Sequence, residues 1–268
     1  MYCKIIQFLN PILKSTKITI MANQNETGIP VNVANFDELI AFVNGYGDDY
    51  KPTKESIKTN ALLLVASHAK EALAAVNLAL PPYTNAVAAR ETAFEPLGKL
   101  VTRLINSLIA TDATKPVVDS AKTLGRKLHG KRATPKKTDE EKKALLAEGK
   151  EVKEISSSQM GVDDKLENCD KLINLLASIT LYDPNEADLK ISALTEMYND
   201  LKIENASVIA AKVPLSRARI LRDSIFNEDN AGLCDVAADV KAYVKSLYGA
   251  TSPQYKQISK LKFTKIKS

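Results

Sequence analysis

The residues that could carry out chemistry are few in this chain, and their spacing does not combine them into a site. His68 and His129 are the two histidines, and neither has another histidine or a cysteine at the spacing of metal ligands. Cys3, Cys169 and Cys234 are too few and too scattered for a disulfide framework. This cysteine usage favours a reducing, cytoplasmic compartment, and it predicts no metal or cofactor.

Sequence motifs of the common enzyme classes are also missing. The chain contains no Gly-x-Ser-x-Gly nucleophile motif, no phosphate-binding P-loop, no dinucleotide fingerprint and no Glu-x-x-His pair for a di-metal bundle. Acidic pairs such as Glu91 and Glu95 stand four residues apart, which is typical of the solvated face of a helix. The pattern therefore predicts a protein without catalytic residues, which is not an enzyme.

The most distinctive polar signal is an arginine followed by an acid, which occurs as Arg90 with Glu91 and as Arg222 with Asp223. Each arginine stands four residues before a phenylalanine, one turn away on the same helix face. We expect each stem to pack on that ring while the guanidinium hydrogen-bonds an acceptor in its own half of the sequence, that is, within its own predicted repeat. The alternative is a pair of anion-binding points.

Basic side chains gather in three windows that contain no acid: residues 1–25, 122–137 and 240–268. These windows hold 17 of the 37 basic residues, so the rest of the chain has 20 basic against 32 acidic side chains. Basic extensions on an acidic body can bind nucleic acid or another polyanion, or can dock on the body itself. The candidate anion contacts are Arg90, Arg222, Arg126, Lys127, Lys131 and Arg132.

These candidates lie within what we interpret as a duplication. Residues 50–94 align without a gap on residues 182–226, and 13 of the 45 aligned pairs are identical. Unrelated segments of this composition are expected to match at about three or four positions. Most identical pairs are small or apolar residues or prolines, including Ala61/Ala193, Leu62/Leu194, Val76/Val208, Pro52/Pro184 and Pro82/Pro214.

The aligned segments predict the organisation of the chain. Shorter matches on either side extend each copy to roughly 95–105 residues. The predicted parts are an N-terminal extension 1–34, a first helical repeat 35–129, a charged and partly helical linker 130–161, and a second repeat 162–268 with a basic tail.

Composition favours helices throughout. The chain is 45% apolar and 26% charged, helix-forming residues dominate, and no sustained period-two alternation is present. No apolar run approaches the ~20 residues that span a bilayer, so we expect no membrane span. The predicted fold class is all-α, with two tandem repeats that each form an up-and-down bundle of about four helices plus a short fifth.

Prolines and polar caps set the predicted helix ends. A proline inside a helix loses a backbone hydrogen bond and clashes with the preceding turn, so Pro82 and Pro214 are predicted as turns between antiparallel helices. Thr84 and Ser216 would then cap the outgoing helices, and Asn35 would cap the first helix of the chain.

The first 20 residues differ from the rest of the chain. Their apolar patches are interrupted by lysines and by Asn10-Pro11, unlike the continuous apolar core of a signal peptide. Met21 is followed by a polar stretch that looks like a natural start, so we expect the mature protein to begin there. An export signal or a short amphipathic arm is the alternative.

Three segments carry a resemblance to a known family. They are Ser158–Met160, Asp183–Ala187 and Gly249–Gln257. They are similar to segments of an all-helical bacterial family with no assigned activity, and the similarity covers most of the chain after Met21. The resemblance implies a helical fold and assigns no role to any residue.

Taken together, these features predict a helical scaffold or protein–protein interaction protein, with a partner protein or a second copy of itself as the binding partner. The alternative is nucleic-acid or other polyanion binding through residues 122–137 and 240–268.

Overall fold

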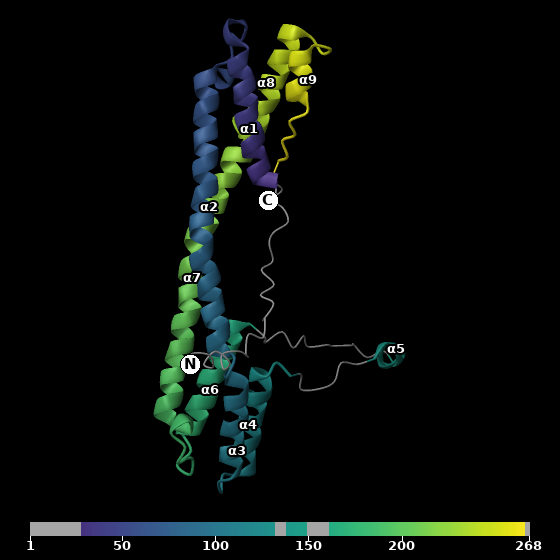
Figure 1. The fold of residues 1–268 in the computed structure, drawn as a ribbon. Helices are drawn as coiled ribbons and strands as arrows, with labels where there is room; N and C mark the ends of the chain where they lie inside the picture. Colours follow the sequence, from purple (N-terminus) through teal and green to yellow (C-terminus); the bar gives the residue numbers. More distant parts are fainter. Residues whose placement is uncertain (1–27, 132–137, 149–160, 266–268) are drawn as a thin grey trace, which may run out of the picture. The chain divides into compact units, whose positions relative to one another are not determined.

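The structure is a computed structural model that describes residues 28–131, 138–148 and 161–265. These residues are helical or lie in turns, and they contain no strand (Figure 1), so the all-α prediction is confirmed. The expected start at Met21 and the candidate contact Arg132 lie outside the described residues.

The described residues form nine α-helices in sequence. They are α1 (Gly28–Gly45), α2 (Thr59–Phe94), α3 (Leu97–Ile109), α4 (Lys115–Leu128), α5 (Asp139–Ala147), α6 (Val162–Ala177), α7 (Ile191–Asn227), α8 (Leu233–Tyr248) and α9 (Pro253–Ser259). Single 3-10 turns occur at η2 (Gly47–Asp49), η3 (Glu55–Ile57) and η4 (Ala187–Leu189). Helix α5, in the charged linker, begins with a capping box between Thr138 and Glu141.

The chain forms two compact units that do not coincide with the ranges 35–129 and 162–268. Among the described residues, unit 1 consists of 28–73 and 221–265, and unit 2 consists of 74–131, 138–148 and 161–220. Helices α2 and α7 each begin in one unit and end in the other. Each unit therefore contains residues from both halves of the sequence.

Unit 1 is built from α1, the start of α2, the end of α7, α8 and α9. Figure 1 shows α8 and α9 beside α1 at the purple and yellow ends of the colour scale. Its core contains fully buried side chains from each of these helices, among them Phe36, Leu62, Phe226, Val240 and Ile258. The buried Asn32 side chain exchanges two hydrogen bonds with the backbone of Thr264, which holds the last described residues along α1.

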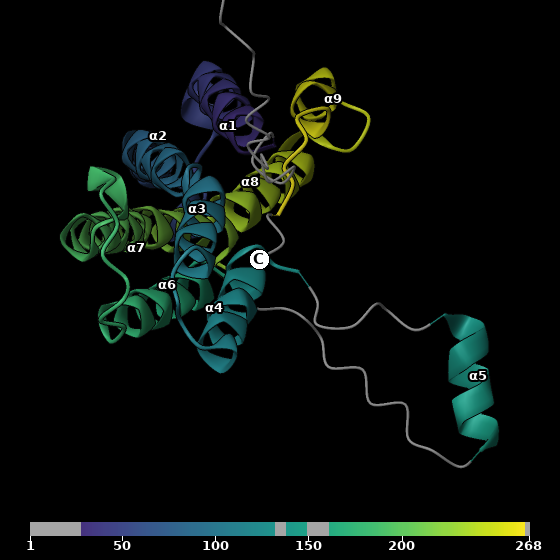
Figure 2. The same cartoon turned by 90° about the horizontal axis from the view of Figure 1, so that it is seen from below.

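Unit 2 contains the end of α2, the start of α7, and α3, α4 and α6. The last three lie close to one another, as Figure 2 shows. Buried side chains such as Leu108, Ala121 and Leu176 fill its core. Helices α3 and α4 approach closely at Gly125, where an added Cβ would lie 2.2 Å from Ile105 Cδ1.

The prediction that Pro82 and Pro214 form turns between antiparallel helices is wrong. Helices α2 and α7 run unbroken through Pro81, Pro82 and Pro214. All three prolines are exposed, so water can satisfy the carbonyl groups that lose their helical partners. Thr84 does not cap a new helix, because its hydroxyl donates to the Leu80 carbonyl within α2.

The predicted start of the first helix at Asn35 is also wrong. Residues 28–34, which the residue pattern assigns to the N-terminal extension, form the first turns of α1. Ile29 and Val33 are buried on the same face as Phe36, which explains why the helix begins earlier. Asn35 lies inside the helix, and its amide donates to the Lys262 carbonyl at 2.7 Å.

By length and composition alone, the helical stretch Thr59–Ile109 could cross a membrane, although no uninterrupted apolar run was expected. Its most apolar window is 28% buried in the structure. One helix of this kind is weak evidence for a membrane span, because length and composition are the only criteria that it meets.

The segments that precede α2 and α7 have the same local structure. The buried Tyr50 hydroxyl donates to the Ile57 carbonyl at 2.7 Å, and the buried Tyr182 hydroxyl donates to the Leu189 carbonyl at 3.0 Å. Both hydrogen bonds close a loop of seven residues that ends in a 3-10 turn. Burial raises the pKa of both phenols, that of Tyr182 to about 12.

This pKa shift predicts a loss of stability at high pH. The unfolded phenol has a pKa of about 10, so the folded state keeps the proton more tightly, and its stability falls as the pH rises from about 10 towards 12. Tyr182→Phe should lower the free energy of unfolding by about 1 kcal/mol at neutral pH and flatten this alkaline decline. Urea unfolding at several pH values measures both effects. Parallel pH profiles for the two proteins would contradict the assignment.

Candidate functional site

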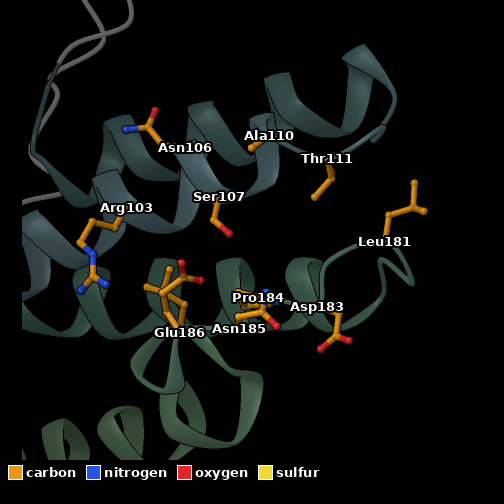
Figure 3. A pocket seen from close by; sticks show the side chains of 11 residues that line it. Arg103, Asn106, Ser107, Ala110, Thr111, Leu181, Asp183, Pro184, Asn185 and Glu186 are labelled. Atoms are coloured by element: carbon orange, nitrogen blue, oxygen red, sulfur yellow. The ribbon is translucent and has the colours of Figure 1, made fainter.

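An open pocket of about 530 Å³ lies in unit 2 between α3 and the loop that leads to η4 (Figure 3). Figure 3 shows the side chains of α3 above the opening and those of the loop below it. The lining is mixed polar and apolar, and consists of Arg103, Asn106, Ser107, Ala110, Thr111, Leu181, Asp183, Pro184, Asn185, Glu186 and Leu189.

The periodicity of α3 explains which of its side chains face the pocket. Arg103, Ser107 and Ala110 follow one another at spacings of four and three residues, which places them on one helix face. The opposite face is apolar and buried, with Leu104 and Leu108 in the core of the unit. The loop across the opening is held by the Tyr182 hydrogen bond described above.

Charge in the pocket is dominated by one ion pair and two further acids. The Arg103 guanidinium binds both carboxylate oxygens of Asp188, with an Nη2–Oδ1 distance of 3.1 Å and a second, shorter contact. This hydrogen bonding lowers the pKa of Asp188 below its usual value. Because Asp188 engages the guanidinium, Asp183 and Glu186 leave the opening acidic on balance.

The pocket lining has hydroxyl and carboxylate side chains and no histidine or cysteine. The Thr111 hydroxyl donates to the Leu108 carbonyl at 2.8 Å. Elsewhere, burial raises the pKa of the Cys169 thiol to about 11 and also raises that of Cys234, which keeps both thiols protonated near neutral pH. In the described part of the chain, no three histidine, cysteine or acidic side chains gather where they could hold a metal ion.

The arginine predictions differ between the two positions. The Arg222 side chain is buried and pairs with Asp223, with Nε–Oδ1 and Nη2–Oδ1 distances of 2.9 Å. Arg90 is half-buried, and its Nη1 donates to Asn205 Oδ1 at 3.1 Å. Its acceptor therefore comes from α7 and not from the same half of the sequence.

Arg90 belongs to a polar network that joins three helices of unit 2. Asn205 on α7 is 8% exposed and accepts from Arg90 on α2. The same amide group donates through Nδ2 to Asp163 Oδ1 on α6 at 2.9 Å. A buried amide that bridges a guanidinium and a carboxylate is a structural link, so these contacts favour the structural interpretation of Arg90.

The described part of the basic segment 122–137 lies on and after α4. Lys131 is exposed, whereas Arg126 and Lys127 are half-buried. Lys127 also lies near Glu167 of α6, whose pKa is lowered mainly by its hydrogen bond with Lys171 and further by Lys127.

The chain matches no family model, and it shows no significant similarity to a curated protein or to a solved structure. In its described residues the chain is an all-α protein with an open pocket beside α3.

The network around Asn205 predicts a selective loss of stability. Asn205→Ala removes a buried amide and leaves the half-buried Arg90 and the exposed Asp163 without their shared partner, so the free energy of unfolding should fall by about 1–3 kcal/mol. Asn174→Ala is the matched control, because that asparagine bonds to Asp170 on an exposed helix face and should change stability by at most about 0.5 kcal/mol. Equal losses in the two variants, measured by urea unfolding, would contradict a buried bridging role.

Proposed function

We propose that this chain is a non-enzymatic, cytoplasmic protein–protein interaction protein, built from two tandem helical repeats, with no membrane span. The pocket beside α3 is the observation that supports a role in protein–protein interaction. It is open, its lining is mixed polar and apolar, and no histidine or cysteine lines it, so it suits recognition of a partner. Its position on rigid helices and a hydrogen-bonded loop favours a preformed site.

Burial at aligned positions supports the two repeats. In α1 and α6, positions 133 residues apart are buried in both helices, at Val33/Leu166, Phe36/Cys169, Leu39/Leu172, Ile40/Ile173 and Val43/Leu176. In α3 and α8, positions 136 residues apart behave in the same way, at Leu97/Leu233, Val101/Ala237, Leu104/Val240 and Leu108/Val244. A shared burial pattern over several helices is expected of duplicated folds.

In this interpretation each compact unit combines the first half of one repeat with the second half of the other. Unit 1 contains α1 and the start of α2 from the first repeat, with α8 and α9 from the second. Unit 2 contains α6 and the start of α7 from the second repeat, with α3 and α4 from the first. We call this the exchanged arrangement.

Charged pairs at aligned positions favour the exchanged arrangement over one in which each repeat folds on itself. In unit 1, Lys54 forms an ion pair with Asp239 of α8. The aligned positions in unit 2 are Glu186 and Arg103, so the signs are reversed, and Arg103 pairs with the neighbouring Asp188. If each repeat folded on itself, Lys54 would face Arg103, and Glu186 would face Asp239. Such like-charge contacts would destabilise the arrangement in which each repeat folds on itself.

Polyanion binding through the basic segments remains the second candidate function. Within residues 240–268, three lysines already have partners in unit 1. Lys241 donates to the Leu261 carbonyl and lies 4.9 Å from the ring centre of Phe263, Lys245 lies 5.8 Å from that of Tyr255, and Lys265 pairs with Asp235 at 2.9 Å. The exposed Lys256, Lys260 and Lys262 are the observation that favours this candidate.

Two measurements on the full chain test the proposed function. Affinity capture from the native cell should recover a protein that binds the wild-type chain and is lost from Ala110→Arg, which blocks the pocket. Binding should be retained by Thr102→Arg, an exposed position on the same helix that does not line the pocket. In fluorescence anisotropy titrations, random duplex DNA should show no saturable binding to the chain that depends on salt concentration.

Identical capture by the two variants would contradict the pocket as the interaction site. A steep salt dependence of DNA binding would instead support the polyanion candidate, with a slope of log K against log salt near −0.9 for each phosphate contacted.

A further inference from the structure

The pocket of unit 2 occupies the place that a tyrosine side chain fills in unit 1. In the alignment of α3 with α8, Ser107 stands at the position of Tyr243. In the alignment of the two loops before the long helices, Asp183 stands at the position of Lys51 and Pro184 at that of Pro52. Aligned positions are compared inside each unit separately.

The Tyr243 side chain in unit 1 shows how this space is used. Its ring lies edge-to-face on the ring of Tyr50, with centres 5.2 Å apart and planes at 89°. Its hydroxyl oxygen accepts a hydrogen bond from the Lys51 backbone N–H at 3.2 Å. The side chain therefore extends from α8 to the loop and closes the gap between them, which is a favourable aromatic arrangement.

In unit 2 the residues at both ends of this path line the pocket. Ser107 replaces the tyrosine with a side chain too short to cross from α3 to the loop, and Asp183 stands at the position of Lys51 at the other end. Figure 3 shows the Ser107 side chain directed towards the loop residues across the opening. Because Ser107 has no ring at the position of Tyr243, the space that the tyrosine fills in unit 1 is left open in unit 2.

We propose that this pocket binds a hydroxyphenyl group, supplied by a tyrosine side chain of the partner polypeptide. The hydroxyl oxygen accepts from the Asp183 backbone N–H, as the Tyr243 hydroxyl accepts from Lys51, and the ring fills the space beside Ser107 and Pro184. The identity of the partner as a polypeptide rests on the proposed function, whereas the hydroxyphenyl group rests on the comparison of the two units.

The charges around the pocket further restrict which ligands can bind. Asp183 and Glu186 repel a phosphate group, and the Arg103 guanidinium that could bind one is held by Asp188. Tyrosine is therefore accepted and phosphotyrosine is rejected. A phenyl ring without the hydroxyl fills the same space but leaves the Asp183 N–H without its acceptor.

The experiment is a titration of the full-length protein, labelled with ¹⁵N, with N-acetyl-L-tyrosine amide. We expect amide shifts centred on Asp183 and Ser107, binding about tenfold weaker for the phenylalanine analogue, and no binding of the phosphotyrosine analogue. Ser107→Tyr should abolish the shifts, because the new side chain fills the pocket. Equal binding of the tyrosine and phenylalanine analogues, or unchanged binding by Ser107→Tyr, would overturn the proposal.

A reciprocal variant tests the proposal even if the Ser107→Tyr protein does not fold. Tyr243→Ser should open the equivalent space in unit 1, so the probe should bind at a second site with shifts at Lys51. A folded Tyr243→Ser protein that binds the probe only in unit 2 would contradict the comparison of the two units.

A further arm separates this inference from the proposed function. If p-cresol binds as tightly as the tyrosine amide, the hydroxyphenyl site stands and the ligand is a free phenol, which contradicts a polypeptide partner. If the tyrosine amide binds more tightly than p-cresol, the polypeptide source is supported. Absence of binding by either probe overturns the hydroxyphenyl site, while partner capture that depends on Ala110 would still support the proposed function.

Discussion

The continuity of α2 and α7 through their prolines is the constraint on which the rest of the structure depends. An α-helix rises 1.5 Å per residue, so the 36 residues of α2 extend for about 54 Å. A compact unit of about 90 residues has a radius of gyration of only about 12 Å. The two ends of such a helix cannot be buried in one small core, and each end must find its own packing partners. Helices α1 and α8 bury the start of α2 in one unit, whereas α3 and α6 belong to the unit that contains its end.

This constraint shows where prediction from the sequence succeeded and where it failed. The helical class follows from composition and periodicity, and the structure bears it out. The break at Pro82 was a local inference from the cost of a proline, about 3 kcal/mol in a helix interior. That cost is offset because the prolines face water, because the helix before them is buried along one face from Leu62 to Val76, and because its end packs partly on the core of unit 2 at Ala93 and Phe94. Tertiary packing decided the outcome, and no window of sequence around the proline contains that information.

The pocket was missed for a related reason. None of its lining residues forms a recognisable motif, and Arg103 reads as one exposed charge among many. The signal that could have revealed it was the difference between Ser107 and Tyr243, but the alignment of α3 with α8 needs an offset of 136, four more than that of the long helices. The four additional residues lie in the connection before α8. Arg90 was identified from the sequence, yet its acceptor Asn205 has a leucine at the aligned position in the first half, so the duplication could not predict it.

The central claim of this account is that each unit combines halves of two repeats, and zero-length carbodiimide cross-linking of the full chain tests it most directly. The account predicts a cross-linked peptide joining Lys54 to Asp239, which are in contact in unit 1. Lys70 and Asp37, 2.8 Å apart and both within residues 35–129, provide the internal control because they are in contact in the same unit. Recovery of both cross-links from monomeric chain by peptide mass spectrometry is the expected result. Recovery of the control link without the Lys54–Asp239 link would contradict the exchanged arrangement.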